Sequence, residues 1–265
     1  MKLPVYKAIS FNGIILEGGH SKPWVVSVNA EGELKPFVVK LYRTIDIEAR
    51  NKMTAEILGC LFAEDFDLLS PTPAIIEFTD EFRMSLGKEY EEILNLLDER
   101  AKFGTEYYEG TFLFAPQMSL EEASKIIQVD TLYAFDYFIC NRDRTLRKPN
   151  LLIKDGKGIL IDHEMALEID NETISRFQEE KWNDKYQYHL FYRLLKEADR
   201  QSKATFFEEF EFYLQSLRLK KYDDIFAQLS EFGFTNLRKE LLEEYFQAVL
   251  KEPLKFKNIL RKSIE

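Results

Sequence analysis

The stretch that decides the fold is LYAFDYFICNRDR, at residues 132–144. Its first part is apolar nearly all round, which is typical of a helix buried in the centre of a domain. Ser119 and Glu122 form a capping-box pattern upstream of it, so we predict one helix from Ser119 to about Cys140. The polar tetrapeptide NRDR then follows at the end of that buried helix.

The acid in this tetrapeptide, Asp143, has the surroundings of a proton acceptor. A carboxylate at the end of a helix, beside Arg142 and Arg144, stays ionised and can take a proton from a hydroxyl group. Taken alone, a loop aspartate between two arginines is more often half of a salt bridge. A second acid further along the chain changes that balance.

This second acid is Asp162, which ends an apolar strand 19 residues after Asp143. Strands predicted at residues 151–154 and 158–162 flank the turn Asp155-Gly156, so a short hairpin joins the two acids. A strand-end carboxylate is a suitable ligand for Mg²⁺, which phosphoryl transfer needs, although it could equally cap the next segment. Together the two acids predict a base beside a metal ligand.

A lysine lies inside an apolar strand predicted at residues 37–42. This residue, Lys40, needs a partner, because an isolated buried ammonium is costly. Glu56 faces the same side as the apolar stripe of a helix predicted at residues 46–63, which favours an inward ion pair that aligns nucleotide phosphates. Glu48 is the alternative partner, and Lys40 could instead extend to solvent at a strand edge.

A glycine-bearing segment, EGGHSKP at residues 17–23, lies between two early strands. Gly18 and Gly19 let the backbone approach phosphate oxygens, and Ser21 and Lys22 add donors, although such hairpin turns are also common without a ligand. In chain order the features run glycine loop, strand lysine, helix glutamate, loop aspartate and strand-end aspartate. That is the order that kinase chemistry uses.

The arrangement of elements predicts an α+β protein with a two-lobed, protein-kinase-like fold. A β-rich, nucleotide-binding N-lobe with an embedded helix takes residues 1–116, and a helical C-lobe with the catalytic loop and metal-binding hairpin takes residues 117–265. The remaining predictions are strands at residues 25–28, 73–78 and 110–116, a charged amphipathic helix at residues 81–101, and helices throughout the last ninety residues.

Composition limits the classes of partner. A formal net charge of −10 argues against nucleic acid as the main partner, because phosphate backbones need clustered cations. Without a long apolar run or a signal-peptide pattern, we expect a cytoplasmic protein that does not enter a membrane. Cys60 and Cys140 indicate buried thiols of a reducing compartment rather than a disulfide or a zinc site.

At these residues the sequence resembles the HipA-like kinase family, a bacterial branch of the protein-kinase-like fold. The family signature is an Asn-x-Asp-Arg loop followed by Asn-Leu-Leu and Ile-Asp-His, matched here by residues 141–145, 150–152 and 161–163. The resemblance covers about residues 12–190 and is looser in the first half. There it includes Ser21-Lys22-Pro23, Val38-Val39-Lys40 and Phe103-Gly104-Thr105.

The resemblance implies a phosphotransferase that uses ATP and Mg²⁺. By similarity, Asp143 would be the catalytic base, Asp162 a Mg²⁺ ligand and Lys40 the phosphate-binding lysine, while Leu113, Phe114 and Ala115 would form the adenine-contacting hinge. The acceptor would be a Ser or Thr hydroxyl of an unidentified protein, and an antitoxin-like or regulatory protein partner is compatible with this. The alternatives are a small-molecule or lipid-headgroup kinase and a nucleotide-binding pseudokinase.

One position departs from the kinase pattern. A metal-binding Asn is expected five residues after the catalytic Asp, and this chain has Lys148 there. Either Asn150 has taken over coordination, with Pro149 bending the loop, or one metal site is missing and the charge of Lys148 substitutes for it. The second option would weaken catalysis or favour a pseudokinase.

Overall fold

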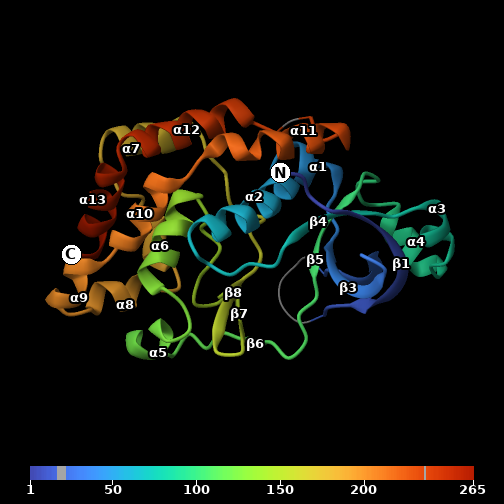
Figure 1. Ribbon diagram of the computed structural model, residues 1–265, viewed down its shortest axis with the longest axis horizontal. Helices are drawn as coiled ribbons and strands as arrows, with labels where there is room; N and C mark the ends of the chain where they lie inside the picture. The colour runs from blue at the N-terminus through green and yellow to red at the C-terminus, as the bar shows by residue number, and fades with distance from the viewer. Residues whose placement is uncertain (17–21, 236) are drawn as a thin grey trace. The chain divides into compact units, whose positions relative to one another are not determined.

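The computed structural model describes residues 1–16, 22–235 and 237–265. Its N-terminal part is rich in strands and its C-terminal part is helical (Figure 1). The chain forms two compact units, each assembled from separate segments. The first takes Met1–Leu58, Pro71–Glu109 and Lys220–Leu237; the second takes Gly59–Ser70, Gly110–Leu219 and Arg238–Glu265. The simple division at residue 116 stays a prediction.

A closed barrel forms the centre of the first unit. Its strands are β1 (Val5–Ile14), β2 (Trp24–Ala30), β3 (Glu33–Lys40), β4 (Pro73–Glu77) and β5 (Lys102–Glu106), in the order β1-β2-β3-β5-β4. Alternate residues of β2 from Trp24 to Ala30 are buried, as expected for a strand with one face in a core. The strands predicted within residues 25–28, 37–42 and 73–78 are therefore present, with shifted ends.

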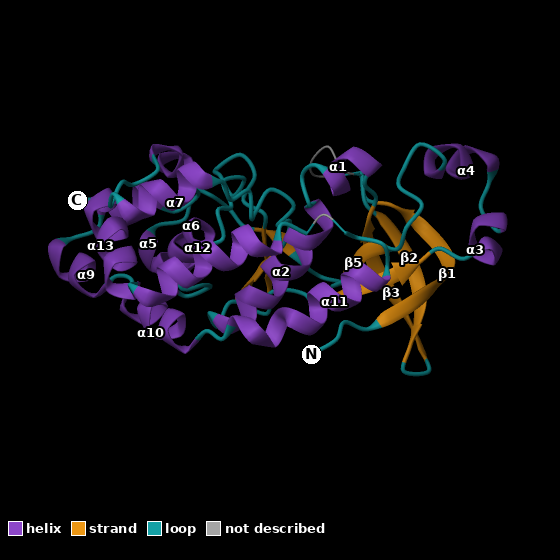
Figure 2. Cartoon of the chain, turned by 90° about the horizontal axis from the view of Figure 1, so that it is seen from above, coloured by secondary structure: helices purple, strands orange, loops and turns teal. Residues whose placement is uncertain are grey.

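Close approach inside the barrel explains one glycine. A Cβ atom at Gly104 on β5 would lie 2.5 Å from Cγ1 of Ile76 on β4, so a larger residue would displace the buried Ile76 side chain. Outside the barrel, α3 (Asp80–Met84) and α4 (Lys88–Leu94) lie beside β1 (Figures 1 and 2). The single helix predicted at residues 81–101 is thus wrong, because the chain is extended at Gly87, before α4 begins.

The helix predicted at residues 46–63 is also two helices. α1 (Thr44–Glu48) and α2 (Lys52–Asp65) are separated at Asn51, whose φ of 53° lies in the left-handed region and ends a regular helix. Far along the chain, α11 (Asp223–Glu231) completes the first unit. Its Gln228 side chain pairs with the backbone N–H and C=O of Leu3, at 2.8 and 3.0 Å.

Helix α6 (Val129–Phe138) is the core of the second unit, and eight of its residues are buried, which confirms the predicted central helix. The predicted capping box at Ser119 and Glu122 is present, but it opens the separate short helix α5 (Leu120–Ser124). Around α6 pack α10 (Glu208–Ser216), α12 (Lys239–Lys251) and α13 (Pro253–Ile264) (Figure 1). The Phe138 ring lies within 6.2 Å of rings on all three of these helices.

A small sheet of β6 (Phe112–Leu113), β7 (Leu151–Lys154) and β8 (Lys157–Leu160) accompanies these helices. Asp155 and Gly156 both have positive φ, as the tight β7–β8 turn requires, so the predicted hairpin is confirmed. The other elements are α7 (Asn171–Gln178), η1 (Asp184–Tyr188), α8 (Tyr192–Glu197), α9 (Arg200–Thr205) and η2 (Leu219–Tyr222). Within the described ranges, every helix is too short or too polar to cross a membrane.

Candidate functional site

The loop that holds Asp143 begins with a sharp change of backbone direction after α6. Cys140 has a φ of 57°, and the next residue, Asn141, is fully buried. The Asn141 side chain donates to Asp136 Oδ1 at 2.8 Å and accepts from the backbone N–H of Asp143 at 3.2 Å. Asn141 therefore connects the end of α6 to the backbone of Asp143.

A buried carboxylate organises the rest of this loop. Asp136 accepts hydrogen bonds at Oδ2 from Arg144 Nε at 2.6 Å and from His189 Nε2 at 2.9 Å. Arg144 is fully buried and also donates to the backbone carbonyls of Pro149 and Asn150. The two ends of the loop are thus fixed to one anion.

The charge state of this cluster follows from its contacts. Burial opposes ionisation of Asp136, but Arg144 and His189 lower its pKa to about 2. His189 Nδ1 accepts from the backbone N–H of Phe191 at 3.1 Å, so the ring carries its proton on Nε2. Burial lowers the pKa of His189 and outweighs the attraction of Asp136, which keeps the ring neutral.

Asp143 itself is half-buried and contacts two nitrogen groups. Lys148 Nζ lies 3.4 Å from each carboxylate oxygen, and Asn150 Nδ2 lies 3.4 Å from Oδ2. Burial raises the pKa of Asp143, and the charge of Asp162 raises it further, against the lowering effects of Lys148 and Asn150. A carboxylate with a raised pKa is a better proton acceptor.

The second predicted acid, Asp162, follows β8 with a φ of 62°. The backbone N–H of Ile161 donates to the carbonyl of Asn150 at 3.1 Å, which ties this segment to the Asp143 loop. Carboxylate oxygens of Asp162 and Glu164 lie within 4.8 Å of each other. Hard oxygen ligands at this spacing suit a divalent cation. The negative charge of Asp162, which raises the pKa of Asp143, is also one that a bound cation would offset.

Glu164 was missing from the sequence prediction. The signal was the second acid in Asp162-His163-Glu164, two residues after a strand end. The residue between the two acids is buried against α2. A Cβ atom at Gly59 would lie 2.5 Å from Cβ of His163, and Cys60 Sγ lies 3.9 Å from His163 Nδ1. This close packing holds the backbone beside Asp162.

In the first unit, the predicted ion pair between Lys40 and Glu56 is present. Lys40 is the last residue of β3, and its ammonium contacts Glu56 Oε1. The Glu56 side chain is 1% exposed and also accepts from the Tyr42 hydroxyl at 3.1 Å. The alternative partner Glu48 instead pairs with Arg100 at 2.6 Å.

The residues predicted for the hinge and for the glycine loop differ in their exposure. Leu113 and Ala115 are exposed, whereas Phe114 is buried in the second unit with its ring 5.5 Å from that of Phe191. Lys22 is exposed, and Gly18, Gly19 and Ser21 lie outside the described residues. The hinge and glycine-loop roles therefore stay predictions, like the catalytic and metal roles of the other residues.

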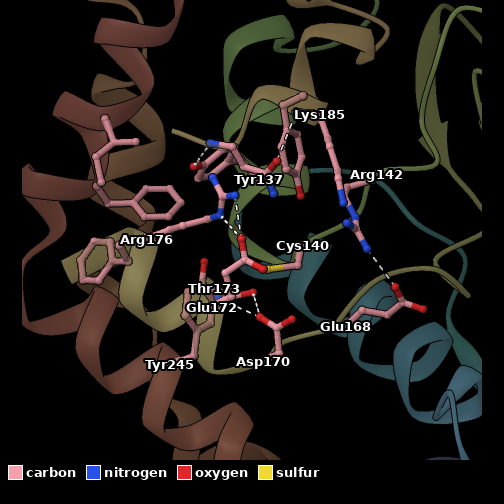
Figure 3. A pocket seen from close by; sticks show the side chains of 15 residues that line it. Tyr137, Cys140, Arg142, Glu168, Asp170, Glu172, Thr173, Arg176, Lys185 and Tyr245 are labelled. Atoms are coloured by element: carbon pink, nitrogen blue, oxygen red, sulfur yellow. Dashed lines mark hydrogen bonds and ion pairs between the residues drawn. The ribbon is translucent and has the colours of Figure 1, made fainter. Parts of the chain in front are cut away.

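A pocket of about 110 Å³ is lined in part by Cys140 and Arg142, which precede Asp143 in the chain (Figure 3). Arg142 and Glu168 pair across it at 2.9 Å, and Arg176 pairs with Glu172 at 2.7 Å. Its wall also contains tyrosines of α6, η1 and α12. None of the described residues predicted for the site lines this pocket, and its two arginines are already neutralised by acids.

Comparison with known proteins gives a family. A family model described as HipA-like kinase matches residues 16–220, which confirms the resemblance seen in the sequence. A solved structure, the Helicobacter pylori proinflammatory kinase CtkA, aligns with a TM-score of 0.45 and 13% identity over 97% of this chain and 98% of its own. That likeness is too distant to support a conclusion. No curated protein matches the sequence.

Proposed function

The chain belongs to the HipA-like kinase family, and we propose that it transfers the γ-phosphoryl group of ATP, with Mg²⁺, to a Ser or Thr hydroxyl of a protein. The observation that carries the proposal is the setting of Asp143. It is a half-buried carboxylate at the end of the central helix, with a raised pKa and an acidic strand end nearby. In this proposal the fold is two-lobed and protein-kinase-like, with lobes at residues 1–116 and 117–265.

Each proposed role follows from a local arrangement. Asp143 accepts the proton of the acceptor hydroxyl, for which its raised pKa suits it. Lys40, oriented by the buried Glu56, binds phosphate oxygens. Asp162, with Glu164 beside it, would hold the divalent cation, which supplies neutralisation of phosphate charge when it is bound.

The buried cluster around Asp136 has a supporting role in this proposal. Arg144 and Asn141 restrain the backbone on both sides of Asp143, so its carboxylate needs little rearrangement before reaction. We assign Asp136, Arg144 and His189 as positioning residues, because they act on Asp143 through the loop.

The test is transfer of label from γ-³²P-ATP to protein, comparing the chain with Asp143→Asn and Asp162→Asn. Each variant should lose labelling by about 100-fold or more, since a general base or a metal ligand is removed. Asp155→Asn is the matched control, because Asp155 is an exposed acid in the β7–β8 turn and should label normally. Unchanged labelling by both site variants would rule the proposal out.

A nucleotide-binding role without turnover is the second candidate, and one observation favours it. Lys148 and Asn150 both direct nitrogen groups at Asp143. The carboxylate proposed to accept the proton therefore already has two hydrogen-bond donors beside it. Binding of ATP without Mg²⁺ and without turnover would favour this role, whereas a Mg²⁺-dependent rise in melting temperature favours the kinase.

A further inference from the structure

The backbone of Lys148 is fixed with respect to the Asp143 loop. Thr145 N–H donates to the Lys148 carbonyl at 2.9 Å, and Lys148 N–H donates back to the Thr145 carbonyl at 3.1 Å. Thr145 also pairs with His189 in an isolated antiparallel bridge. The Lys148 side chain therefore extends from a restrained backbone toward the Asp143 carboxylate.

The ammonium lies over the carboxylate as a whole. Its distances to Oδ1 and Oδ2 of Asp143 are both 3.4 Å, and the two side chains are 46% and 23% exposed. A positive charge at this distance attracts the anion and repels any further cation that approaches the same carboxylate. The local charge that a divalent ion would bring to this place is thus partly supplied by the chain.

Asn150, the other residue near the expected second ion, already has contacts within the loop. Its side-chain nitrogen is directed at Asp143 Oδ2, and its backbone carbonyl accepts from Ile161 N–H and from Arg144. Its φ of 45° places it in the left-handed region, so the surrounding bonds hold an uncommon backbone conformation. Lys148 and Asn150, the two residues at the expected place of a second ion, therefore both direct nitrogen donors at the same carboxylate.

Protein kinases generally use two Mg²⁺ ions, one held by a strand-end Asp and one by a catalytic-loop Asn. We propose that in this chain the Lys148 ammonium takes the place of the second ion, so that a single divalent cation, held at Asp162, serves the reaction. This inference rests on the proposed function. It explains why a lysine can occupy position 148 in a chain that keeps Asp143 and Asp162.

The reaction balances without a further co-reactant. The acceptor oxygen forms a bond to the γ-phosphorus, the bond from that phosphorus to the bridging oxygen breaks, and ADP leaves with the bridging oxygen. The hydroxyl proton passes to Asp143. Once Asp143 is neutral, its hold on Lys148 weakens, and the ammonium becomes available to the phosphate oxygens.

The experiment counts metal ions in the complex with a non-hydrolysable ATP analogue. Bound Mn²⁺ is measured by electron paramagnetic resonance while analogue binding is followed by calorimetry. The unaltered chain should bind one Mn²⁺ per analogue, and Lys148→Asn should bind two. Lys148→Met should still bind one and should lose turnover by about 100-fold, because the charge goes and no ligand replaces it. Arg147→Met changes an exposed neighbour and should match the unaltered chain both in the number of bound Mn²⁺ ions and in turnover.

Two ions on the unaltered chain, or one ion on a folded Lys148→Asn variant, would overturn the inference. If nucleotide binds with two ions and label is transferred, the inference fails and the proposed function stands. If the unaltered chain binds no nucleotide, the proposed function fails and the inference with it. Lys148 is exposed, so its substitution should leave the melting temperature close to that of the unaltered chain.

Discussion

Asp143 is subject to opposing influences within its own loop. Burial and the charge of Asp162 raise its pKa, while Lys148 and Asn150 lower it. A base must be deprotonated to act, so activity should fall as the pH drops through the pKa of Asp143. The balance between these neighbours therefore sets the lower pH limit of kcat/KM, which reports the free enzyme.

Removing the Lys148 charge should shift that limit. In Lys148→Met the lowering influence is lost, so the pKa of Asp143 rises further and the acidic limb of the kcat/KM profile moves to higher pH. The profile is measured at saturating metal with protein labelling as the readout. Arg147→Met should leave the limb in place, and an acidic limb that stays put in Lys148→Met would contradict this account of Asp143.

At the scale of elements, a single buried cluster joins α6 to a segment far along the chain. Asp136 and His189 are 53 residues apart, yet they share a hydrogen bond in the core. Sequence patterns located α6 and its burial correctly, because an unbroken apolar surface is visible without any partner. They missed the role of Asp136, since its partners become neighbours only through long-range packing.

This cluster should make stability depend on pH. The folded pKa of His189 lies below 6.5, and that of Asp136, at about 2, lies below 3.8. In both cases the unfolded chain binds protons first as the pH falls. The His189 contribution is therefore complete above pH 6.5 and is lost as the pH drops through its lowered folded pKa. The Asp136 contribution is complete above pH 3.8 and is lost as the pH approaches about 2.

Urea unfolding on either side of pH 6.5 tests this. In His189→Gln the amide can still donate to Asp136, but the residue no longer titrates, so the fall in stability just below pH 6.5 should flatten. Arg144→Met should instead lower the free energy of unfolding by about 3–5 kcal/mol at neutral pH, because it strips a partner from a buried charge. An identical pH profile for His189→Gln and the unaltered chain would contradict the lowered pKa of His189.

The predicted helix bounds were wrong for a similar reason, because sequence periodicity does not reveal where the folded backbone interrupts a helix. The patterns at residues 46–63 and 119–140 each continue through a break that local sequence does not reveal, such as the left-handed Asn51. The β7–β8 hairpin was predictable because its turn residues demand positive φ by themselves. Glu164 escaped notice because its proximity to Asp162 depends on the chain path after β8.

At the scale of the whole molecule, the two compact units each combine segments that are distant in sequence. Gln228 bonds to Leu3 across 225 residues, so the first unit is completed by a segment near the end of the chain. The family match ends at residue 220, where that segment begins. Sequence motifs therefore identify the kinase family, whereas the structure is needed to show which chain segments form each unit.

The roles proposed for the two units differ, and so do the expected consequences of altering them. Lys40 in the first unit is proposed to bind phosphate, so Lys40→Met should weaken nucleotide binding and, by leaving Glu56 buried without its ammonium, lower stability. Asp143 in the second unit is proposed to act only on the acceptor proton. Its removal should leave nucleotide binding intact.

The most direct test is thus the turnover of Asp143→Asn at saturating MgATP, measured beside its nucleotide affinity. We predict an affinity within about threefold of the unaltered chain and phosphoryl transfer slower by about 1,000-fold, as expected when a general base is lost. Transfer within about tenfold of the unaltered rate, at unchanged affinity, would contradict the assignment of Asp143 as the base of a kinase.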